Sequence, residues 1–263
     1  MLMLTHIWIL KEFLASQAFN PDYLDLYAYN VSPDLLTFHP AITSEMTHGI
    51  ARFRDLPAPH RKAAFVHFHL LVDDLAHYGH ICDKPVSVFN PDSEGYTYVR
   101  GRSLVQPIRA FQKRFGHEIS FSEAAYQSHI LIEMAFDLVL NQSKNKTGLI
   151  PLFSESLGAV AKNGLEEFGR TMEWLADIRG ETASEAFAHG VGLCTPERMN
   201  GLTNVEGRIN LFIDKFGLDR NDQAVSAGAV ELMEQGMDLV RDYESFLKPT
   251  IEKIKASAFR YSL

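Results

Sequence analysis

The segment FVHFHLLVDDLAHYGH, residues 65–80, decides the fold because it combines a helical apolar pattern with regularly spaced metal-ligand side chains. His69, Asp73 and His77 stand at positions i, i+4 and i+8 of this segment. Four residues of an α-helix turn through about 400°, so each of these side chains lies roughly 40° around the helix from the one before it. The spacing therefore predicts a helix with these three residues in a single stripe along one face.

A second segment, SHILIEMAFDLVL at 128–140, repeats the pattern with His129, Glu133 and Asp137. Most of the other residues in both segments are apolar, which predicts helices buried in a bundle. An unpaired carboxylate is costly to bury, so each acid needs a cation or a hydrogen-bonded partner. A lone His-x-x-x-Asp pair on a surface helix would be a weak salt bridge, whereas two stripes in apolar sequence favour a metal site in the core.

Helical spacing of apolar residues extends over most of the chain and predicts an all-α, multi-helix bundle. The exception lies at about 85–100, where alternating residues on both sides of the turn-forming segment 90–95 predict one small β-hairpin. A polar segment at 141–148 is a natural boundary. We expect a helical metal-binding region at 1–140 and a helical C-terminal region at 141–263 that packs on it to form one compact domain.

The composition of the 263 residues is that of a globular protein, with 46% hydrophobic and 22% charged residues. A net charge of −8 argues against general nucleic-acid binding, and two cysteines are too few for a disulfide scaffold or a Cys-based zinc module. The chain has no apolar run long enough for a transmembrane helix, and its N-terminal segment lacks the features of a signal peptide. We therefore expect a cytoplasmic protein, of an oligomeric state that the sequence leaves open.

Three further candidate metal ligands precede the first stripe. Asp34 ends a Ser-Pro-Asp sequence that we interpret as a short turn presenting the carboxylate. His48 precedes a glycine, and His6 lies in the apolar N-terminal helix. Taken singly, each has a structural interpretation: Asp34 as a helix N-cap, His48 as a surface residue and His6 as a hydrogen-bonded core residue.

Taken together and in order, these motifs resemble the zinc-dependent phospholipase C family, which is related to the zinc nucleases that cleave single-stranded nucleic acid. The family combines an N-terminal helix carrying a His, a Pro-Asp turn, a further His, a His-x-x-x-Asp helix followed by another His, and a His-x-x-x-Glu. This chain carries THIWIL (5–10), SPDLL (32–36), THG (47–49), HLLVDDLAH (69–77) and HILIE (129–133). The resemblance covers about residues 1–140 and depends on the order of the set, because each motif is short.

The resemblance implies two or three bound zinc ions, with manganese or iron as alternatives. Asp34 would be a metal ligand and the catalytic residue that orients or deprotonates the attacking water, and His6 would belong to a third site. The implied ligands of the other two ions are His48, His69 and Asp73 for the first, and His129, Glu133 and either His77 or His80 for the second.

These features predict a metal-dependent hydrolase that acts on a phosphate ester, phosphodiester-like or phospholipid-like, with a metal-activated water as nucleophile. The substrate would be a small molecule or a lipid. Two alternatives stay open: a structural or otherwise non-catalytic metal-binding helical protein, and a dimetal oxidoreductase. A basic stretch without acids at 95–117 would be either a solvated face or a surface that steers an anionic substrate.

Overall fold

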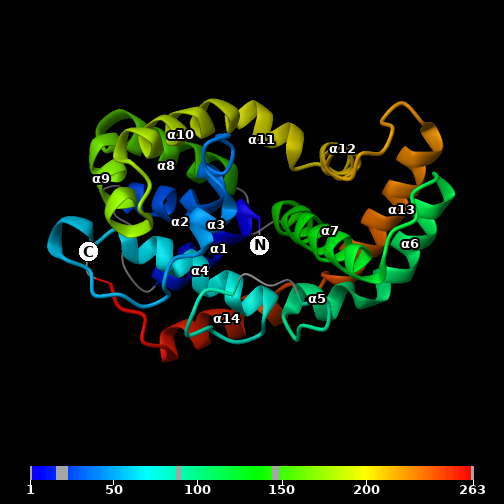
Figure 1. Ribbon diagram of the computed structural model, residues 1–263, viewed down its shortest axis with the longest axis horizontal. Helices are drawn as coiled ribbons and strands as arrows, with labels where there is room; N and C mark the ends of the chain where they lie inside the picture. Colours follow the sequence, from blue (N-terminus) through cyan, green and yellow to red (C-terminus); the bar gives the residue numbers. More distant parts are fainter. Residues whose placement is uncertain (1, 16–22, 87–89, 144–147, 262–263) are drawn as a thin grey trace.

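The computed structural model describes residues 2–15, 23–86, 90–143 and 148–261, and within them all regular secondary structure is helical (Figure 1). The prediction of an all-α protein is confirmed. The first helices are α1 (Met3–Leu14), α2 (Leu24–Leu36), α3 (Ser44–His48), η2 (Ala58–His60), α4 (Ala63–His77), α5 (Tyr96–Gly101), η3 (Arg102–Leu104), α6 (Val105–Arg114) and α7 (Phe121–Gln142). They are followed by α8 (Leu149–Asn163), α9 (Leu165–Ala176), α10 (Gly180–Leu193), α11 (Pro196–Leu202), α12 (Val205–Lys215), α13 (Gln223–Leu239) and α14 (Glu244–Ala256).

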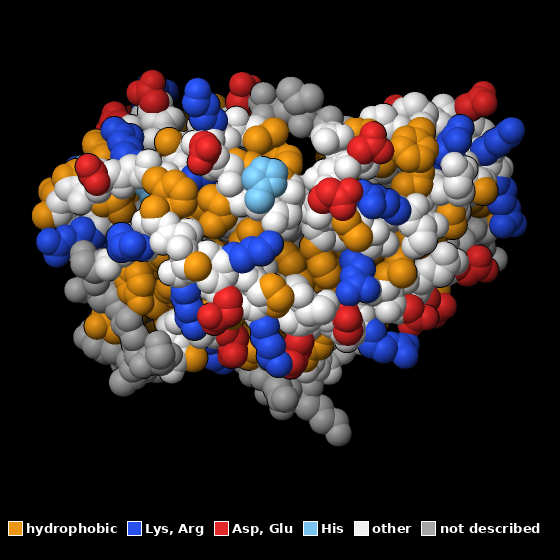
Figure 2. Space-filling model, turned by 90° about the horizontal axis from the view of Figure 1, so that it is seen from below, with side chains coloured by type: hydrophobic (Ala, Val, Ile, Leu, Met, Phe, Trp, Pro, Cys, Tyr) orange, Lys and Arg blue, Asp and Glu red, His pale blue; other side chains and the backbone are white. Residues whose placement is uncertain are grey.

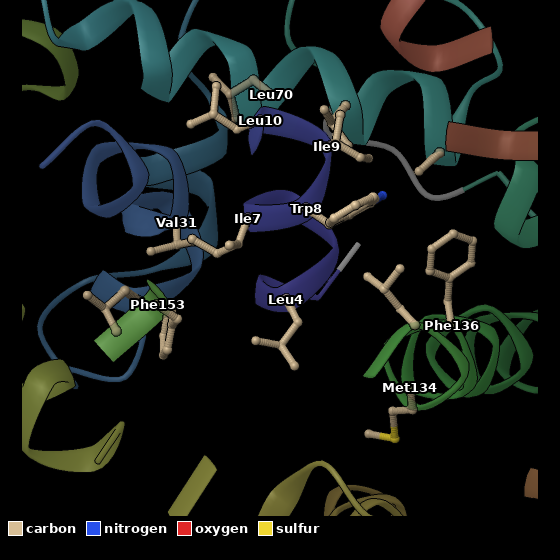
Figure 3. Close-up of a cluster of buried hydrophobic side chains, with 14 of the residues drawn as sticks. Leu4, Ile7, Trp8, Ile9, Leu10, Val31, Leu70, Met134, Phe136 and Phe153 are labelled. Carbon is tan, nitrogen blue, oxygen red and sulfur yellow. The ribbon is translucent and has the colours of Figure 1, made fainter. Parts of the chain in front are cut away.

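Helix α1 is buried on almost every side (Figure 3). Its apolar side chains project in several directions: Ile7 lies near Val31 of α2, and Leu10 lies near Leu70 of α4 (Figure 3). A helix that is apolar all around is stable only inside a protein, where other helices cover each of its faces. Two polar residues of α1, Thr5 and His6, are therefore carried into the core and are fully buried.

The two segments with ligand stripes form α4 and α7, as the spacing predicts. Helix α4 is almost completely buried, α7 is buried over most of its length, and both pack against α1. Helix α7 begins with a capping box, in which the N–H of Glu123 donates to Oγ of Ser120 and the N–H of Ser120 donates to the Glu123 carboxylate. Helix α4 ends at His77.

The predicted β-hairpin at about 85–100 is wrong in its second half, because Tyr96–Gly101 is helix α5. The backbone of Gly95 approaches the end of α4 so closely that a Cβ there would overlap the carbonyl of His77. Oγ1 of Thr97 donates to the carbonyl of Ala76 over 3.0 Å, which fixes the first turn of α5 on α4. Tertiary contacts thus override an alternating, β-favouring sequence. Residues 87–89 of the first predicted strand lie outside the described residues.

The predicted turn at Asp34 is also wrong, since Pro33 and Asp34 lie inside α2. Proline has no N–H to bond to the carbonyl four residues earlier, here that of Tyr29. Oγ of Ser32 donates to that carbonyl instead, over 2.8 Å. The Ser-Pro pair therefore continues the helix by satisfying the acceptor that proline leaves open.

Helices beyond residue 140 cover the earlier helices from two sides. Helix α8 packs on α1 and α2, and α10 packs on α2, whereas α13 packs on α7 (Figure 1). Between these groups, α11 contacts α8, and α12 contacts both α7 and α13. In the described parts of the chain, no helix combines the length and the apolar character needed to cross a membrane.

Candidate metal centre

The carboxylate of Asp73, on α4, lies among three imidazoles from three helices. Nε2 of His6 on α1 is 3.3 Å from Oδ1, and Nε2 of His69 on α4 is 3.3 Å from Oδ2. Nε2 of His48, the last residue of α3, is 3.5 Å from the same Oδ2. The rings of His6 and His69 stack with their centroids 3.7 Å apart. The fold therefore brings His6, His48 and the first stripe together.

Asp34 joins this cluster from α2. Its Oδ1 is 3.4 Å from Nε2 of His48 and 3.8 Å from Nε2 of His69. Ligand atoms of Asp34, His48 and His69 lie within 4.8 Å of one another, and so do those of His6, His69 and Asp73. We call these five residues the first cluster. The two overlapping groups share His69. His6 therefore lies with the other four ligands and not at the separate third site that the resemblance implies.

A second cluster joins the end of α4 to α7. Nε2 of His77 lies 2.7 Å from Oε1 of Glu133, and ligand atoms of His77, His129 and Glu133 all lie within 4.8 Å of one another. The structure does not bring His80 into this cluster. Because α4 ends at His77, His80 lies in the following turn, where it is exposed and its Nδ1 is 3.0 Å from the carbonyl of Tyr78.

The last residue of the second stripe, Asp137, has different partners. Its Oδ1 accepts hydrogen bonds from the N–H and the hydroxyl of Thr5, at 3.0 and 2.6 Å. Its Oδ2 accepts from Arg208 of α12 at 3.1 Å, and the two charged side chains are almost completely buried. Asp137 therefore joins α7 to α1 and α12 rather than adding a ligand to the second cluster.

A buried ion pair holds His48 against α4. Arg52 donates to both carboxylate oxygens of Asp74, from Nε at 3.0 Å and from Nη2 at 2.7 Å. Nη1 of Arg52 also donates to the carbonyls of His48 and Ile50, at 2.9 and 2.8 Å. Arg52 therefore fixes the end of α3 to the residue that follows Asp73. Sequence reasoning missed this pair, although the second acid of the Asp73-Asp74 dipeptide was a signal, because a buried carboxylate needs a partner.

The ring of His48 is oriented by hydrogen bonds at its other nitrogen. Nδ1 lies 2.9 Å from Oγ1 of Thr47 and 3.1 Å from the carbonyl of Ser44. Because a carbonyl only accepts, Nδ1 carries the proton in that interaction and Nε2 is directed toward the carboxylates. Metal-binding histidines are commonly held in this way.

Burial and neighbouring charges shift the pKa values of both clusters. Burial would raise the pKa of the Asp73 carboxyl, but neighbouring positive charge and hydrogen bonds from His48 and His6 hold that pKa well below its ordinary value. Burial lowers the pKa of His69 to about 4 and that of His129 to about 3. For His48, contacts with Asp34 and Asp73 outweigh burial and raise the pKa to about 10. Uncharged imidazole nitrogens and ionised carboxylates, which these shifts favour at most positions, are the forms that bind metals.

Both clusters open on one cleft of about 1390 Å³. Its lining includes Asp34, His48 and Asp73 of the first cluster and all three residues of the second. Helices α11 and α12 supply further lining residues, among them Met199, Leu202 and Leu211. Residues of both clusters therefore line the same space.

The basic residues of 95–117 do not line this cleft. Arg100 pairs with Asp242 at 3.0 Å, and Arg102 pairs with Glu94 at 2.7 Å. Acidic and basic side chains are interspersed on the face drawn in Figure 2, without a broad patch of one sign. Within the described residues, this arrangement agrees with the solvated-face interpretation of the stretch.

Comparison with protein-family models, with curated proteins and with solved structures finds no match to this chain. The resemblance to zinc-dependent phospholipases C therefore stays a prediction that rests on the ordered motifs.

Proposed function

We propose that this protein is a metal-dependent hydrolase of phosphate esters, with one ion site at each cluster and zinc as the preferred ion. One observation carries the proposal. Two His–carboxylate clusters, built on the same helix α4 and facing one cleft, are contributed by α1, α2, α3, α4 and α7. Separate surface salt bridges would not require so many elements to converge on one space.

The donor set fits a divalent ion. Both ring nitrogens of His69 are buried and make no hydrogen bond within the described part of the chain, although Nε2 lies 3.3 Å from Oδ2 of Asp73. A buried polar atom without a hydrogen bond is costly, and a metal ion would satisfy it. Imidazole with carboxylate suits zinc, and manganese or iron are alternatives.

His69 would hold an ion together with Asp34, Asp73, His48 and His6, and the second cluster would hold another. Bound divalent ions supply Lewis-acid polarisation of a phosphoryl oxygen and lower the pKa of a water molecule. Asp34 is partly exposed at the cleft. Its carboxylate would orient that water and accept its proton, which makes Asp34 the proposed catalytic base. Asp73 and Glu133 are almost completely buried and would act as ligands.

The remaining cleft lining is rich in apolar side chains, including Phe38, Ile130 and Met134 beside the clusters. An apolar lining next to a phosphate-binding centre favours an ester with an apolar portion over a simple inorganic phosphate. The proposed substrate is therefore a small-molecule or lipid phosphodiester.

The test begins with elemental analysis of protein purified without a metal-affinity tag, beside His69→Ala and His129→Ala variants. We expect about two equivalents of metal and a partial loss in each variant, with hydrolysis of bis(p-nitrophenyl) phosphate abolished in both. The control is His117→Ala, because His117 is exposed and lies outside both clusters. A metal-free wild type, after reloading with zinc, manganese or iron, would refute the proposal.

The same samples separate the alternatives. A purely structural metal predicts that chelation unfolds the chain, which circular dichroism would detect. A dimetal oxidoreductase predicts visible absorbance when the iron-loaded protein meets oxygen.

A further inference from the structure

Nearly every acidic side chain that lines the cleft is already compensated. Three of the acids belong to the two clusters: Asp34, Asp73 and Glu133. Two more, Asp74 and Asp137, are paired with arginines that also line the cleft. Glu45 is the remaining acid among the described lining residues. With ions bound at the clusters, the negative charge of this cleft is therefore small.

Several cations in the same lining are not compensated. Lys84, Arg198 and Lys215 line the cleft, and none of them forms an ion pair with another described residue. Other described basic side chains, such as Arg109 and Arg179, also form no ion pair with a described residue, so these three differ in lining the cleft. Their positive charge therefore lies where a substrate would bind.

These three cations lie outside the helices that contribute the cluster residues. Arg198 lies in α11, Lys215 ends α12, and Lys84 lies in the segment after α4. Nζ of Lys215 lies 5.9 Å from the centroid of the Tyr126 ring, and that ring lies 4.9 Å from the ring of His129. Lys215 is therefore close to the second cluster without belonging to it.

We propose that Lys84, Arg198 and Lys215 form an anion-binding subsite, so that the substrate is a phosphoester with a second anionic group beyond the scissile phosphate. This inference rests on the proposed function. A phosphate at the ions would leave the rest of the molecule against these cations, which attract an anionic group and repel a cationic one. A charged hydrogen bond favours an anionic group by about tenfold in binding.

The experiment compares two esters that differ by one phosphate: dioctanoyl phosphatidylinositol and dioctanoyl phosphatidylinositol 4-phosphate. We expect kcat/KM of the zinc-loaded wild type to be about tenfold higher for the second ester. The double variant R198Q/K215Q should lose this preference, so that its kcat/KM values for the two esters become similar. Arg220→Gln is the matched control, because Arg220 lies just after α12 and pairs with Asp214 outside the cleft.

A second measurement does not depend on turnover. Inositol 1,4-bisphosphate, titrated calorimetrically into the zinc-loaded protein, should bind about tenfold more weakly to R198Q/K215Q than to the wild type and to Arg220→Gln. Equal preference for the two esters, or equal binding by the wild type and the double variant, would overturn the subsite. Failure of the proposed function is distinct: neither ester would be hydrolysed, and the binding measurement alone would then decide on the subsite.

Discussion

Replacing Arg52 with Met tests whether the buried ion pair with Asp74 supports both the fold and the first cluster. Met keeps much of the aliphatic volume but removes all four hydrogen bonds of the guanidinium. Asp74 would stay fully buried, with the N–H of Cys82 at 3.0 Å as its remaining partner. Removing one partner of such a pair costs about 3–5 kcal/mol, because an uncompensated charge is left in the protein interior.

The assay is urea denaturation of the metal-free protein, with thermal melting as a second probe. For a chain of this size the expected loss corresponds to a fall in Tm of roughly 10 °C. The double variant R52M/D74L should be less destabilised than the sum of the two single variants, since it leaves no charge unpaired. A loss below about 1 kcal/mol for Arg52→Met, or full additivity in the double variant, would refute the reasoning.

Metal affinity provides the functional readout of the same variant. Arg52 holds the backbone carbonyl of His48, so its loss should loosen His48 and weaken zinc binding at the first cluster by about tenfold to a hundredfold. Within the described part of the chain, Arg52 bonds to His48, Ile50 and Asp74 and not to the second cluster, which should keep its affinity. Competition with a chromogenic chelator measures the two affinities. Equal weakening at both clusters would point to general unfolding instead.

Three further predictions follow from the described contacts. His77→Ala should remove the metal of the second cluster, whereas His80→Ala should keep it, because His77 contacts Glu133 and His80 does not. Elemental analysis of the two variants measures this. Loss of metal in His80→Ala but not in His77→Ala would contradict the geometry of the cluster. Burial lowers the pKa of His67 to about 4, so acid favours the unfolded state, in which this pKa is near its ordinary value. The stability due to neutral His67 is complete above about pH 6.5, and about 3 kcal/mol of it is lost as the pH falls toward 4. In His67→Phe, the free energy of unfolding measured in urea should depend less on pH over that range. An unchanged pH dependence would exclude His67 as the cause. The carboxylates of Asp34 and Asp73 raise the pKa of His48 to about 10, so zinc binding at pH 7 should release about one proton from His48. Calorimetry in buffers of different ionisation heat should detect this release in the wild type and not in His48→Gln.

Local geometry explains which features could be predicted from the sequence. Residues four apart on a helix are neighbours whatever surrounds the helix, so the pairing of His69 with Asp73 followed from spacing alone. The apolar residues around the stripes likewise predicted that α4 and α7 are buried, and their burial is confirmed.

Contacts between elements depend on how the whole chain packs, and spacing does not encode them. The sequence left His77 and His80 as equal candidates, and the end of α4 at His77 separates them. Asp137 continues a perfect stripe, yet Thr5 and Arg208 reach it from distant helices.

The two wrong local predictions have the same origin. Tyr96–Gly101 alternates like a strand but is helical, because Gly95 and Thr97 fit against the end of α4. Pro33 usually indicates a turn, but the hydroxyl of Ser32 satisfies the free carbonyl within α2. The sequence by itself thus determined the helices and the spacing of their ligands, because both are local properties of the backbone. Only the tertiary structure decided which ligands meet, because that depends on packing between segments far apart in the chain.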